Sequence, residues 1–476
     1  MKKAIKKFMA ALLAVAMLCA MAVPAFAASA NNNGSITVKK AVNDQTYNAY
    51  RIFDLESYTT GKDGNYSYTL SEKWEKAGFA SSTAFTTYFE LDGNYVKAKD
   101  NLSDSTAADF AKLALTFAKT NNVSADATAV AAGEEAHFTN LPTGYYLVDT
   151  TVGSLCMLDT TADDVEIDEK NEVPDIDKTI TGGTTENTSD AKIGDVVDYK
   201  VVVHAKKGAA NYVVTDTMTE GLTFNNDIKV TVGSNTLTNG TDYDVTATEH
   251  GYTLTFSQTY LDTLTANSTD ITITYSATLN SKAAIKGEEG ANKNTVKLTY
   301  GNNIDTTEKF TETSTYKFDL VKTDDAKKLL ADAHFSLYES EVGGEAIKLV
   351  DLGNGVYRVA DKNDTVTTTD IVTVDTGIIT IKGLNKATYY LEETKAPQGF
   401  NKLDSRQKVD LTDGNKLANM TDATTYVDGG VNVVNKSGTV LPSTGGMGTT
   451  LFYVIGGGLM VAAVILLVTK KRMENK

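Results

Sequence analysis

The chain has 476 residues and a formal net charge of −16 at pH 7. So acidic a surface is poorly suited to nucleic acid, and two cysteines cannot build a disulfide framework. Because the length exceeds what one hydrophobic core normally supports, we expect about two to four domains.

The chain begins with the pattern of an export signal. An apolar run from Phe8 to Val23 leads into a small-x-small cleavage site that ends at Ala27. The run is preceded by a basic segment that contains Lys2, Lys3, Lys6 and Lys7. We therefore predict that residues 1–27 form a signal peptide and that the mature protein is secreted. Its removal leaves Cys156 as a single thiol, which we interpret as a buried small hydrophobe rather than a catalytic nucleophile.

Most of the mature region predicts β-strands. Residues 35–38, 197–201 and 271–275 alternate polar with apolar side chains, and polar turns separate such segments. This alternation is typical of half-buried antiparallel strands, and many short strands in series indicate β-sandwiches. The main exception is residues 105–120, where Ala and Phe recur at helical spacing; a weaker helix is predicted at 71–76. We therefore predict a mainly β fold of tandem immunoglobulin-like sandwiches, the first with helical insertions.

A repeated motif and two polar crossings suggest where the domains divide. Tyr-Tyr-Leu at 145–147 recurs at 389–391, so two domains share a strand type. Short polar crossings lie near residues 171–177 and 302–315. We therefore divide the chain into a signal peptide (1–27), an amino-terminal domain (28–172), a middle sandwich (173–308), a carboxy-terminal sandwich (309–438) and a terminal segment (439–476).

A strand of alternating charge ends the predicted first domain. Its apolar residues, Val165 and Ile167, face one way. The charged residues face solvent on the other side: Glu166, Asp168 and Lys170. The Lys170 side chain is then an amine that an outside enzyme can reach. The alternative interpretation is an ordinary solvated run of charges.

Strand parity places three polar side chains in the core of the middle sandwich. Lys178, Asp216 and Asn294 each share a face with apolar residues two positions away on the same strand. Asn292 has the same parity as Asn294, so periodicity does not choose between the two asparagines. We predict a reactive triad of Lys178, Asp216 and Asn294; the alternative is an ordinary hydrogen-bonded set.

The last domain repeats this pattern with Lys322, Glu393 and Asn435. Burying a lone ammonium and a lone carboxylate is costly, so the pKa of each group shifts in the direction that favours its neutral form. A neutral lysine amine is a nucleophile, and a protonated Glu393 would polarise the Asn435 carbonyl and pass a proton to the departing ammonia. We therefore predict an isopeptide bond between Lys322 and Asn435. The alternative is a buried Lys–Glu ion pair with the asparagine as a hydrogen-bond partner.

The chain ends in a pentapeptide, an apolar run at 451–468 and a basic tip at 470–472. The pentapeptide consists of Leu441, Pro442, Ser443, Thr444 and Gly445. This ending resembles the cell-wall sorting signal of Gram-positive surface proteins, in which a sortase cuts between the residues that match Thr444 and Gly445. The resemblance implies that the Thr444 carbonyl becomes an amide on another amine.

Three internal segments resemble parts of Gram-positive pilins. Residues 389–400 look like the pilin E-box, with Phe400 where Tyr is usual, and residues 214–224 are similar to the acid-bearing strand of the corresponding domains. Residues 165–174 are similar to the pilin motif, but Asp-Glu replaces the common Tyr-Pro before Lys170. The resemblance implies Cna-B-type sandwiches, internal bonds promoted by an acid in each, and a lysine that receives the threonine of the next subunit. The residues concerned are Lys178, Asp216 and Asn294, then Lys322, Glu393 and Asn435, and finally Lys170 and Thr444.

These observations predict a structural shaft subunit of a covalently polymerised pilus, not an enzyme with turnover. The expected partners are a pilin sortase, a housekeeping sortase, identical subunits and peptidoglycan. We expect no cofactor and no metal, because the four histidines are scattered. The alternative is a singly wall-anchored adhesin or basal pilin that binds a host surface ligand.

Overall fold

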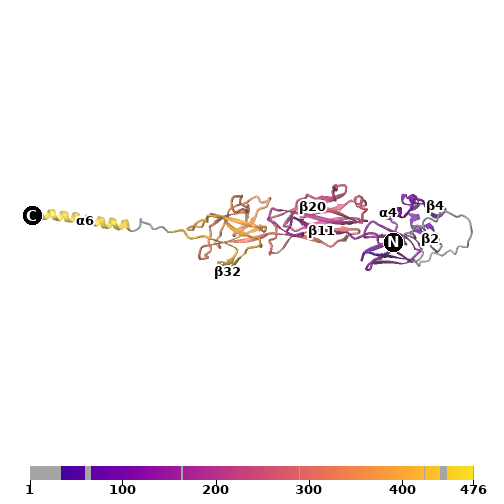
Figure 1. The fold of residues 1–476 in the computed structure, drawn as a ribbon, viewed down its shortest axis with the longest axis horizontal. Coiled ribbons are helices and arrows are strands. Elements are labelled where there is room, and N and C mark those ends of the chain that lie inside the picture. Colours follow the sequence, from indigo (N-terminus) through magenta and orange to yellow (C-terminus); the bar gives the residue numbers. More distant parts are fainter. Residues whose placement is uncertain are drawn as a thin grey trace. The chain divides into compact units, whose positions relative to one another are not determined.

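The structure of the chain is a computed structural model that describes residues 34–58, 66–161, 164–288, 290–422, 424–439 and 448–474. The predicted signal peptide and residues 441–445 lie outside the described residues. Internal contacts divide the chain into two compact units. The first is formed mainly by residues up to Lys317 and the second mainly by residues from Phe318 onward; Figure 1 colours the chain in sequence order.

The first part of the first unit combines a three-stranded sheet with a larger one. In the small sheet, β1 (Gly34–Lys39) lies between the parallel strand β10 (Asp164–Asp168) and the antiparallel strand β7 (Glu135–Leu141). The larger sheet has the order β4-β5-β3-β2-β8-β9, with β6 paired to β2. Its strands are β2 (Thr46–Tyr58), β3 (Tyr66–Leu70), β4 (Phe89–Asp92), β5 (Tyr95–Ala98), β6 (Ala127–Val130), β8 (Gly144–Thr150) and β9 (Met157–Thr161).

Helices cover one aromatic-rich core of this part. The longest helix is α4 (Asp104–Thr120), which is labelled in Figure 1. It buries Phe110 and Ala114 in the cluster that contains Phe53 and Trp74, as its helical spacing predicts. Its first turn is closed by the Ser103 backbone N–H, which donates to Thr106 Oγ1 at 2.8 Å. The predicted helical insertions are thus confirmed. Three shorter helical segments accompany α4: α2 (Glu72–Lys76), η2 (Phe79–Ser81) and α3 (Thr83–Tyr88).

The second part of the first unit is a sandwich of two sheets (Figure 1). One sheet has the order β11-β13-β20-β16-β17, with β15 on β20, and the other has the order β12-β23-β21-β14-β19-β18, with β22 on β21. In the first sheet the strands are β11 (Asp175–Thr181), β13 (Val196–Lys206), β15 (Leu222–Phe224), β16 (Lys229–Val232), β17 (Asn235–Thr236) and β20 (Ser268–Leu279). In the second they are β12 (Thr188–Asp190), β14 (Val213–Met218), β18 (Tyr243–Thr248), β19 (Gly251–Phe256), β21 (Asn292–Tyr300), β22 (Ile304–Asp305) and β23 (Lys309–Ser314), with the short helix α5 (Gln258–Leu261) after β19.

The second unit contains a second sandwich. Its sheets have the orders β26-β27-β29-β24-β34 and β28-β25-β30-β31, and β32 pairs with β33. The strands are β24 (Tyr316–Thr323), β25 (His334–Tyr338), β26 (Leu349–Asp351), β27 (Val356–Val359), β28 (Ile371–Val372), β29 (Ile378–Leu384), β30 (Thr388–Lys395), β31 (Gln407–Asp410), β32 (Ala418–Asp422), β33 (Thr425–Gly429) and β34 (Val431–Val434).

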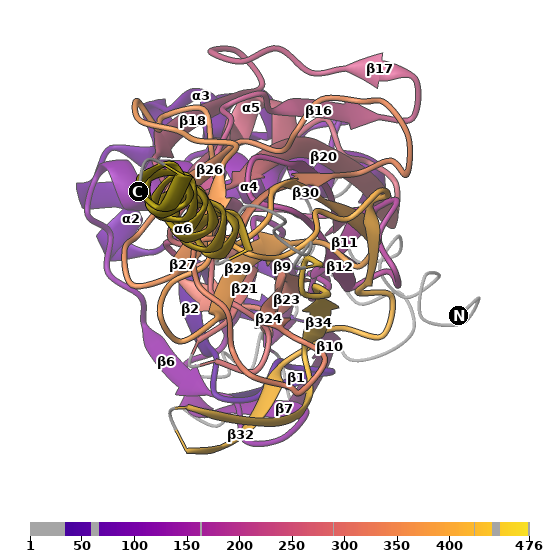
Figure 2. The ribbon, with the colours of Figure 1, turned by 90° about the vertical axis from the view of Figure 1, so that its left-hand side faces the viewer.

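A single apolar helix, α6 (Gly448–Glu474), ends the described chain, and Figure 2 shows it as one uninterrupted coil. Residues Phe452–Glu474 have a mean hydropathy of 2.3 and the length needed to cross a membrane. Its last turn carries Lys471 and Arg472. These features fit the predicted membrane-spanning part of the terminal segment.

The two-residue period of the sequence reappears as burial. Along β21, alternate residues from Asn292 to Tyr300 are buried and those between them are half-buried. In β13 every second residue from Val197 to Ala205 is buried in the same way. Side chains on a strand alternate between its faces, so the inward set of each sheet forms the sandwich core. The mainly β fold is therefore confirmed, and polar residues with inward parity are carried into that core.

The α4 core provides a direct test of this packing. We expect Phe110→Ala to lower the free energy of unfolding of this part by about 3–5 kcal/mol, because a fully buried ring leaves a cavity. Leu113→Ala on the same helix removes a side chain that is 40% exposed and is expected to cost within about 0.5 kcal/mol. Urea unfolding followed by the fluorescence of Trp74, the only tryptophan, reports on this core. Equal losses in the two variants would show that α4 does not pack as described.

Candidate cross-linking sites

In the second unit, Lys322 and Asn435 lie side by side because the first and last strands of the sandwich are neighbours. Strand β24 pairs with β34 in parallel, with Lys322 opposite Val433. The Asn435 backbone N–H continues this ladder by donating to Thr323 O at 3.0 Å. The Lys322 and Asn435 residues are both 0% exposed. The pairing thus brings an amine and an amide from opposite ends of the domain into one core.

Glu393 reaches the same place from β30 in the facing sheet. Asn435 Nδ2 donates to Glu393 Oε2 at 2.9 Å, and the Leu403 backbone N–H donates to that oxygen at 2.8 Å. Asn435 Nδ2 also donates to Asn401 O at 2.8 Å. Glu393 Oε1 and Asn435 Oδ1 are buried and have no hydrogen-bond partner. The carboxyl group therefore touches the nitrogen that would leave, and the amide carbonyl stays open to a nucleophile.

Burial also alters the acid–base chemistry of Lys322. Desolvation lowers the pKa of its amine to about 8, while the nearby Glu393 charge acts in the opposite direction. Lys322 Nζ donates to Val433 O at 3.1 Å and to Thr323 O at 3.3 Å, which holds it at the joint between β24 and β34. With this pKa, about a tenth of the amine is unprotonated at pH 7, far more than for a lysine with the usual pKa of about 10.4. Lys322 can therefore act as a nucleophile where an exposed lysine would not.

The middle sandwich assembles its triad across two sheets. Lys178 lies on β11, whereas Asp216 and Asn294 lie on the neighbouring strands β14 and β21 of the opposite sheet. The β14–β21 register sets Met218 opposite Asn294 and Asp216 opposite Val296, so the acid and the amide share the inward face. All three residues of the triad are buried. Strand parity predicted this convergence, and the pairing of the strands produces it.

A short ion pair joins the first two members of this triad. Lys178 Nζ lies 2.5 Å from Asp216 Oδ2, and both side chains are fully shielded from solvent. Desolvation lowers the pKa of Lys178 and raises the pKa of Asp216, which favours transfer of a proton from amine to carboxylate. Lys178 Nζ also lies 5.0 Å from the centroid of the Tyr199 ring. The pair is therefore enclosed by aromatic rings rather than by water.

Tyr275 also belongs to this site, although it was not among the site residues predicted from the sequence. Its hydroxyl donates to Asp216 Oδ2 at 2.5 Å, accepts from Asn294 Nδ2 at 3.2 Å and is hydrogen-bonded to Lys178 Nζ. Tyr275 lies on β20 with the same parity as the buried residues Ile271 and Ile273. That parity is the signal in the sequence that could have placed it in the core.

The structure treats the two candidate asparagines differently. The Asn292 amide is occupied by backbone groups: Nδ2 donates to Ala284 O and Thr313 O at 2.9 and 3.0 Å, and Oδ1 accepts from Ala284 N at 2.8 Å. Asn294 instead faces Tyr275, and its Oδ1 has no hydrogen-bond partner. Strand parity alone does not distinguish Asn292 from Asn294 as the asparagine of the triad. The position of Asn292 at the start of β21, next to a loop, separates them.

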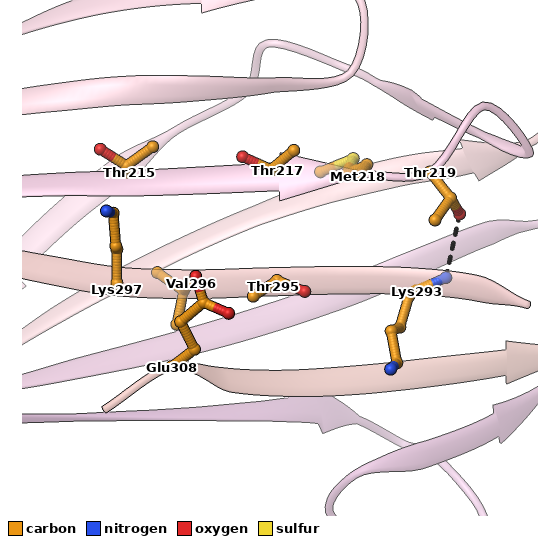
Figure 3. Close-up of a pocket in the computed structure, with 9 residues that line it drawn as sticks. All are labelled: Thr215, Thr217, Met218, Thr219, Lys293, Thr295, Val296, Lys297 and Glu308. Carbon is orange, nitrogen blue, oxygen red and sulfur yellow. Dashed lines mark hydrogen bonds between the residues drawn. The ribbon is translucent and has the colours of Figure 1, made fainter. Parts of the chain in front are cut away.

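The outer face of the same two strands shows the other half of the alternation. A pocket of about 330 Å³ lies there, and its lining includes Thr215 and Thr217 of β14 and Lys297 of β21 (Figure 3). Figure 3 also shows the Lys293 backbone N–H donating to Thr219 Oγ1, at 3.0 Å. These outward residues alternate with the inward triad residues. A shift of one residue in register would exchange the two sets and dismantle the triad.

Lys170 lies directly after β10 and is exposed, as predicted for an amine that an enzyme must reach. Its Nζ donates to Cys156 O at 3.3 Å. The surrounding protein lowers the pKa of this amine mainly by desolvation, and the positive charge of Lys207 acts in the same direction. Lys170 is thus accessible from solvent and has a lowered pKa.

The two neighbours of Lys170 are buried and hold its backbone in place. Glu169 Oε1 accepts from the backbone N–H groups of Lys170 and Asn171, both at 2.8 Å. Asn171 Nδ2 donates to Leu155 O at 2.8 Å, and Asn171 Oδ1 accepts from Leu155 N at 3.0 Å. A Cβ at Gly153 would come within 2.3 Å of Asn171 Oδ1, so glycine is required there. The interpretation of the whole segment as a solvated charge run therefore fails at Glu169 and Asn171.

In the described part of the first domain, lysines and acids form ion pairs instead of a triad with an asparagine. Lys39 pairs with Glu135 at 2.5 Å, and Lys40 pairs with Asp168 at 2.9 Å. The buried Asp149 lies 3.4 Å from the Nζ of Lys119, an α4 residue whose side chain is largely exposed. Cys156 is buried, and desolvation raises the pKa of its thiol to about 12. Among the described residues, no three His, Cys, Asp or Glu side chains are grouped so as to hold a metal ion.

Comparison with known protein families agrees with this architecture. Residues 193–304 match the Gram-positive pilin backbone subunit 2, Cna-B-like domain; residues 316–424 match a prealbumin-like fold domain; and residues 433–475 match the LPXTG cell-wall anchor motif. The chain is therefore a cell-wall-anchored surface protein of Gram-positive bacteria. More narrowly, it belongs to the Gram-positive backbone pilins and is a structural subunit of a surface pilus.

Solved structures show the same fold. The T6 backbone pilin of serotype M6 Streptococcus pyogenes is 17% identical, with 80% of this chain and 81% of that one aligned at a TM-score of 0.53. The full-length RrgB pilus protein of Streptococcus pneumoniae is also 17% identical, with 87% of this chain and 100% of that one aligned at a TM-score of 0.50. No curated protein sequence matched the chain. At these identities the likeness concerns the fold.

The environment of Lys322 predicts an unusual titration. In an Asn435→Ala variant, which keeps the amine unlinked, we expect Lys322 to titrate with a midpoint of about 8, because its ammonium form is desolvated. The measurement is the pH dependence of the lysine ¹³Cε resonances by NMR. The Lys322 resonance is assigned as the one that is missing from the double variant Asn435→Ala, Lys322→Arg. Since unfolded lysine keeps its proton to about pH 10.4, this variant should gain stability as the pH rises from about 8 toward 10. A midpoint near 10.4 would show that the amine is solvated.

Proposed function

We propose that this pilin is the shaft subunit of a covalently polymerised pilus, stabilised by an isopeptide bond in each of its two sandwiches. The observation that carries the proposal is the convergence of a lysine, an acid and an asparagine, all buried, in both cores. We retain the prediction of three domains, divided near residues 172 and 308. The chain would be a substrate and a building block, and its only chemistry of its own would be the internal bonds.

In the carboxy-terminal sandwich the proposed bond joins Lys322 Nζ to Asn435 Cγ. The neutral amine attacks the open amide carbonyl, the Cγ–Nδ2 bond breaks, and the amide nitrogen leaves as ammonia. Glu393, which is hydrogen-bonded to Asn435 Nδ2 at 2.9 Å, relays a proton from the attacking amine to the leaving nitrogen. The exclusion of water by the core strengthens these polar interactions and keeps the amide from being hydrolysed. No outside reactant is consumed.

In the middle sandwich the proposed bond joins Lys178 to Asn294. The opposite pKa shifts of Lys178 and Asp216 supply a neutral amine and a carboxylic acid in one dry site. The backbone contacts of Asn292 leave Asn294 as the asparagine that faces this pair. Because Lys178 and Asn294 belong to different sheets, the bond would tie the two layers together as well as two distant parts of the chain.

These bonds suit a protein that carries tension along its length. Strands β24 and β34 are the first and last strands of their sandwich, so a bond between them would link the two ends of the domain directly. A pulling force would then pass through the cross-link instead of peeling the strands apart. Cross-links also restrict the unfolded chain, as disulfides do, and an amide resists reduction. The single cysteine of the mature region leaves no disulfide within one chain for this purpose.

Polymerisation would join subunits through Lys170 and Thr444. In this proposal a pilin sortase cleaves between Thr444 and Gly445, and the Lys170 amine of another subunit receives the Thr444 carbonyl. The exposure of Lys170, its lowered pKa and its fixed backbone support its role as the acceptor. A housekeeping sortase would transfer the last subunit to peptidoglycan. The helix α6 would retain each precursor in the membrane until cleavage.

The internal bonds are tested by mass. The mature region, residues 28–444, is expected to fall short of its sequence mass by two molecules of ammonia, since each bond releases one. Lys178→Ala and Lys322→Ala should each leave a deficit of one, and the double variant none. Asn294→Ala should also remove one deficit, whereas Asn292→Ala, a matched change two residues away on the same face of β21, should keep both. A full sequence mass in the unaltered protein would refute both triads.

The intersubunit bond is tested on cells. Wild-type cells should show a ladder of SDS-resistant species of high mass, and Lys170→Ala should reduce it to single subunits, because the acceptor amine is gone. Lys40→Ala is the matched control: it removes an exposed lysine of the same domain, whose side chain lies beside Asp168, and should leave the ladder intact. A ladder that survives in Lys170→Ala would show that the acceptor is misassigned. Absence of a ladder in wild-type cells would favour the singly anchored adhesin.

A further inference from the structure

Tyr275 occupies the centre of the middle-sandwich triad. Its hydroxyl is within hydrogen-bond distance of all three reacting partners: Lys178 Nζ, Asp216 Oδ2 at 2.5 Å and Asn294 Nδ2 at 3.2 Å. The ring packs between two other tyrosines, stacking on Tyr199 at 5.4 Å and meeting Tyr252 edge-on at 5.0 Å. This packing fixes the position of the hydroxyl. A single phenol thus connects the nucleophile, the acid and the leaving group.

The two sandwiches differ in how the acid reaches the amide. In the second unit the longer side chain of Glu393 contacts Asn435 Nδ2 directly, at 2.9 Å. In the middle sandwich the acid is an aspartate, one methylene shorter, and its hydrogen bonds go to Lys178 and Tyr275. Tyr275 in turn is hydrogen-bonded to Asn294. The tyrosine hydroxyl therefore bridges the distance that the extra methylene covers in the other site.

We propose that Tyr275 is a catalytic residue of the Lys178–Asn294 cross-link, in which its hydroxyl relays a proton from Asp216 to the departing amide nitrogen of Asn294. This inference rests on the proposed internal bond and assigns a further group to it. The role requires a hydroxyl that touches both the acid and the leaving group, and the described hydrogen bonds of Tyr275 meet that requirement.

The proposed steps conserve every proton. The Lys178 ammonium first gives a proton to Asp216, and the neutral Nζ attacks Asn294 Cγ to form a tetrahedral adduct. In one concerted transfer Tyr275 protonates Nδ2 while Asp216 gives its proton to the Tyr275 oxygen. The Cγ–Nδ2 bond breaks, ammonia leaves, and the surplus proton on Nζ passes to the Asp216 carboxylate. The products are a neutral amide, a carboxylic acid, an unchanged tyrosine and one ammonia.

The surroundings of Tyr275 suit a relay rather than a permanent acid or base. Burial, together with the nearby Asp216 charge, raises the pKa of its phenol well above the usual value, so the hydroxyl keeps a proton at neutral pH. A hydroxyl that donates and accepts at once can pass a proton along without carrying a charge of its own. This matters in a core where Asp216 Oδ1 and Asn294 Oδ1 have no hydrogen-bond partner and a further charge would be costly.

The test is the rate at which the cross-link forms in Tyr275→Phe. The full mature region is pulse-labelled with isotopic amino acids as it is synthesised in cells, and the labelled Lys178–Asn294 peptide is quantified by mass spectrometry at successive times after the pulse. We expect Tyr275→Phe to form this link at least about 100-fold more slowly than the unaltered protein, the usual minimum contribution of a positioned proton donor. Tyr300→Phe is the matched control, because Tyr300 is a buried tyrosine on the same strand as Asn294 and has no described hydrogen bond or ring contact with Lys178, Asp216 or Asn294. It should link at the normal rate.

A second variant separates a chemical role from a structural one. Asp216→Glu added to Tyr275→Phe supplies the longer acid found in the other sandwich, and we expect it to restore part of the lost rate. If Tyr275→Phe forms the link at the normal rate, the inference is wrong. It is also wrong if Tyr275→Phe lacks the native circular dichroism spectrum, because the slower linking would then come from a folding defect. Failure of the proposed bond itself looks different: the unaltered protein would then lack the Lys178–Asn294 peptide as well.

Discussion

The desolvation of an amine and an acid in the core of a β-sandwich is the constraint on which this structure depends. Neither Lys322 nor Lys178 is solvated, and for both the surrounding protein lowers the pKa of the ammonium. A core usually tolerates such groups only as a paired and fully hydrogen-bonded set. Here the pairing is incomplete, since an amide oxygen remains without a partner at each site. Burying these groups therefore costs free energy, and it also places the amine beside a reactive amide. A covalent bond between the two would remove that cost.

The two sandwiches meet this constraint with different geometry. The carboxy-terminal site joins adjacent strands of one sheet and draws its acid from the other, whereas the middle site spans the two sheets and uses a shorter acid with a tyrosine between. Both keep the nucleophile, the acid and the amide on inward faces of strands. The shared requirement is a dry, rigid core that holds all three groups in place.

The proposed acceptor segment around Lys170 has an exposed functional side chain, in contrast to the buried triads. Lys170 remains exposed while the residues on either side of it, Glu169 and Asn171, are buried and bind the backbone of the same segment and of Leu155. Rigid backbone with an accessible side chain limits the entropy lost when an enzyme positions the amine. Strand alternation indicated the exposed lysine, and the same parity puts Glu169 and Asn171 inward. It could not show that the partners of these two side chains are backbone groups of the segment itself and of Leu155.

The sequence by itself determined the mainly β fold, the long helix α4, the apolar segment of α6 and the inward direction of the triad residues, because side-chain period and burial follow directly from local pattern. Only the tertiary structure decided which asparagine faces Lys178 and that Tyr275 lies between the acid and the amide. Asn292 and Asn294 have identical parity, and Tyr275 is one of several inward aromatic residues. Contacts between strands far apart in the chain depend on register and on the packing of facing sheets, which no local pattern records.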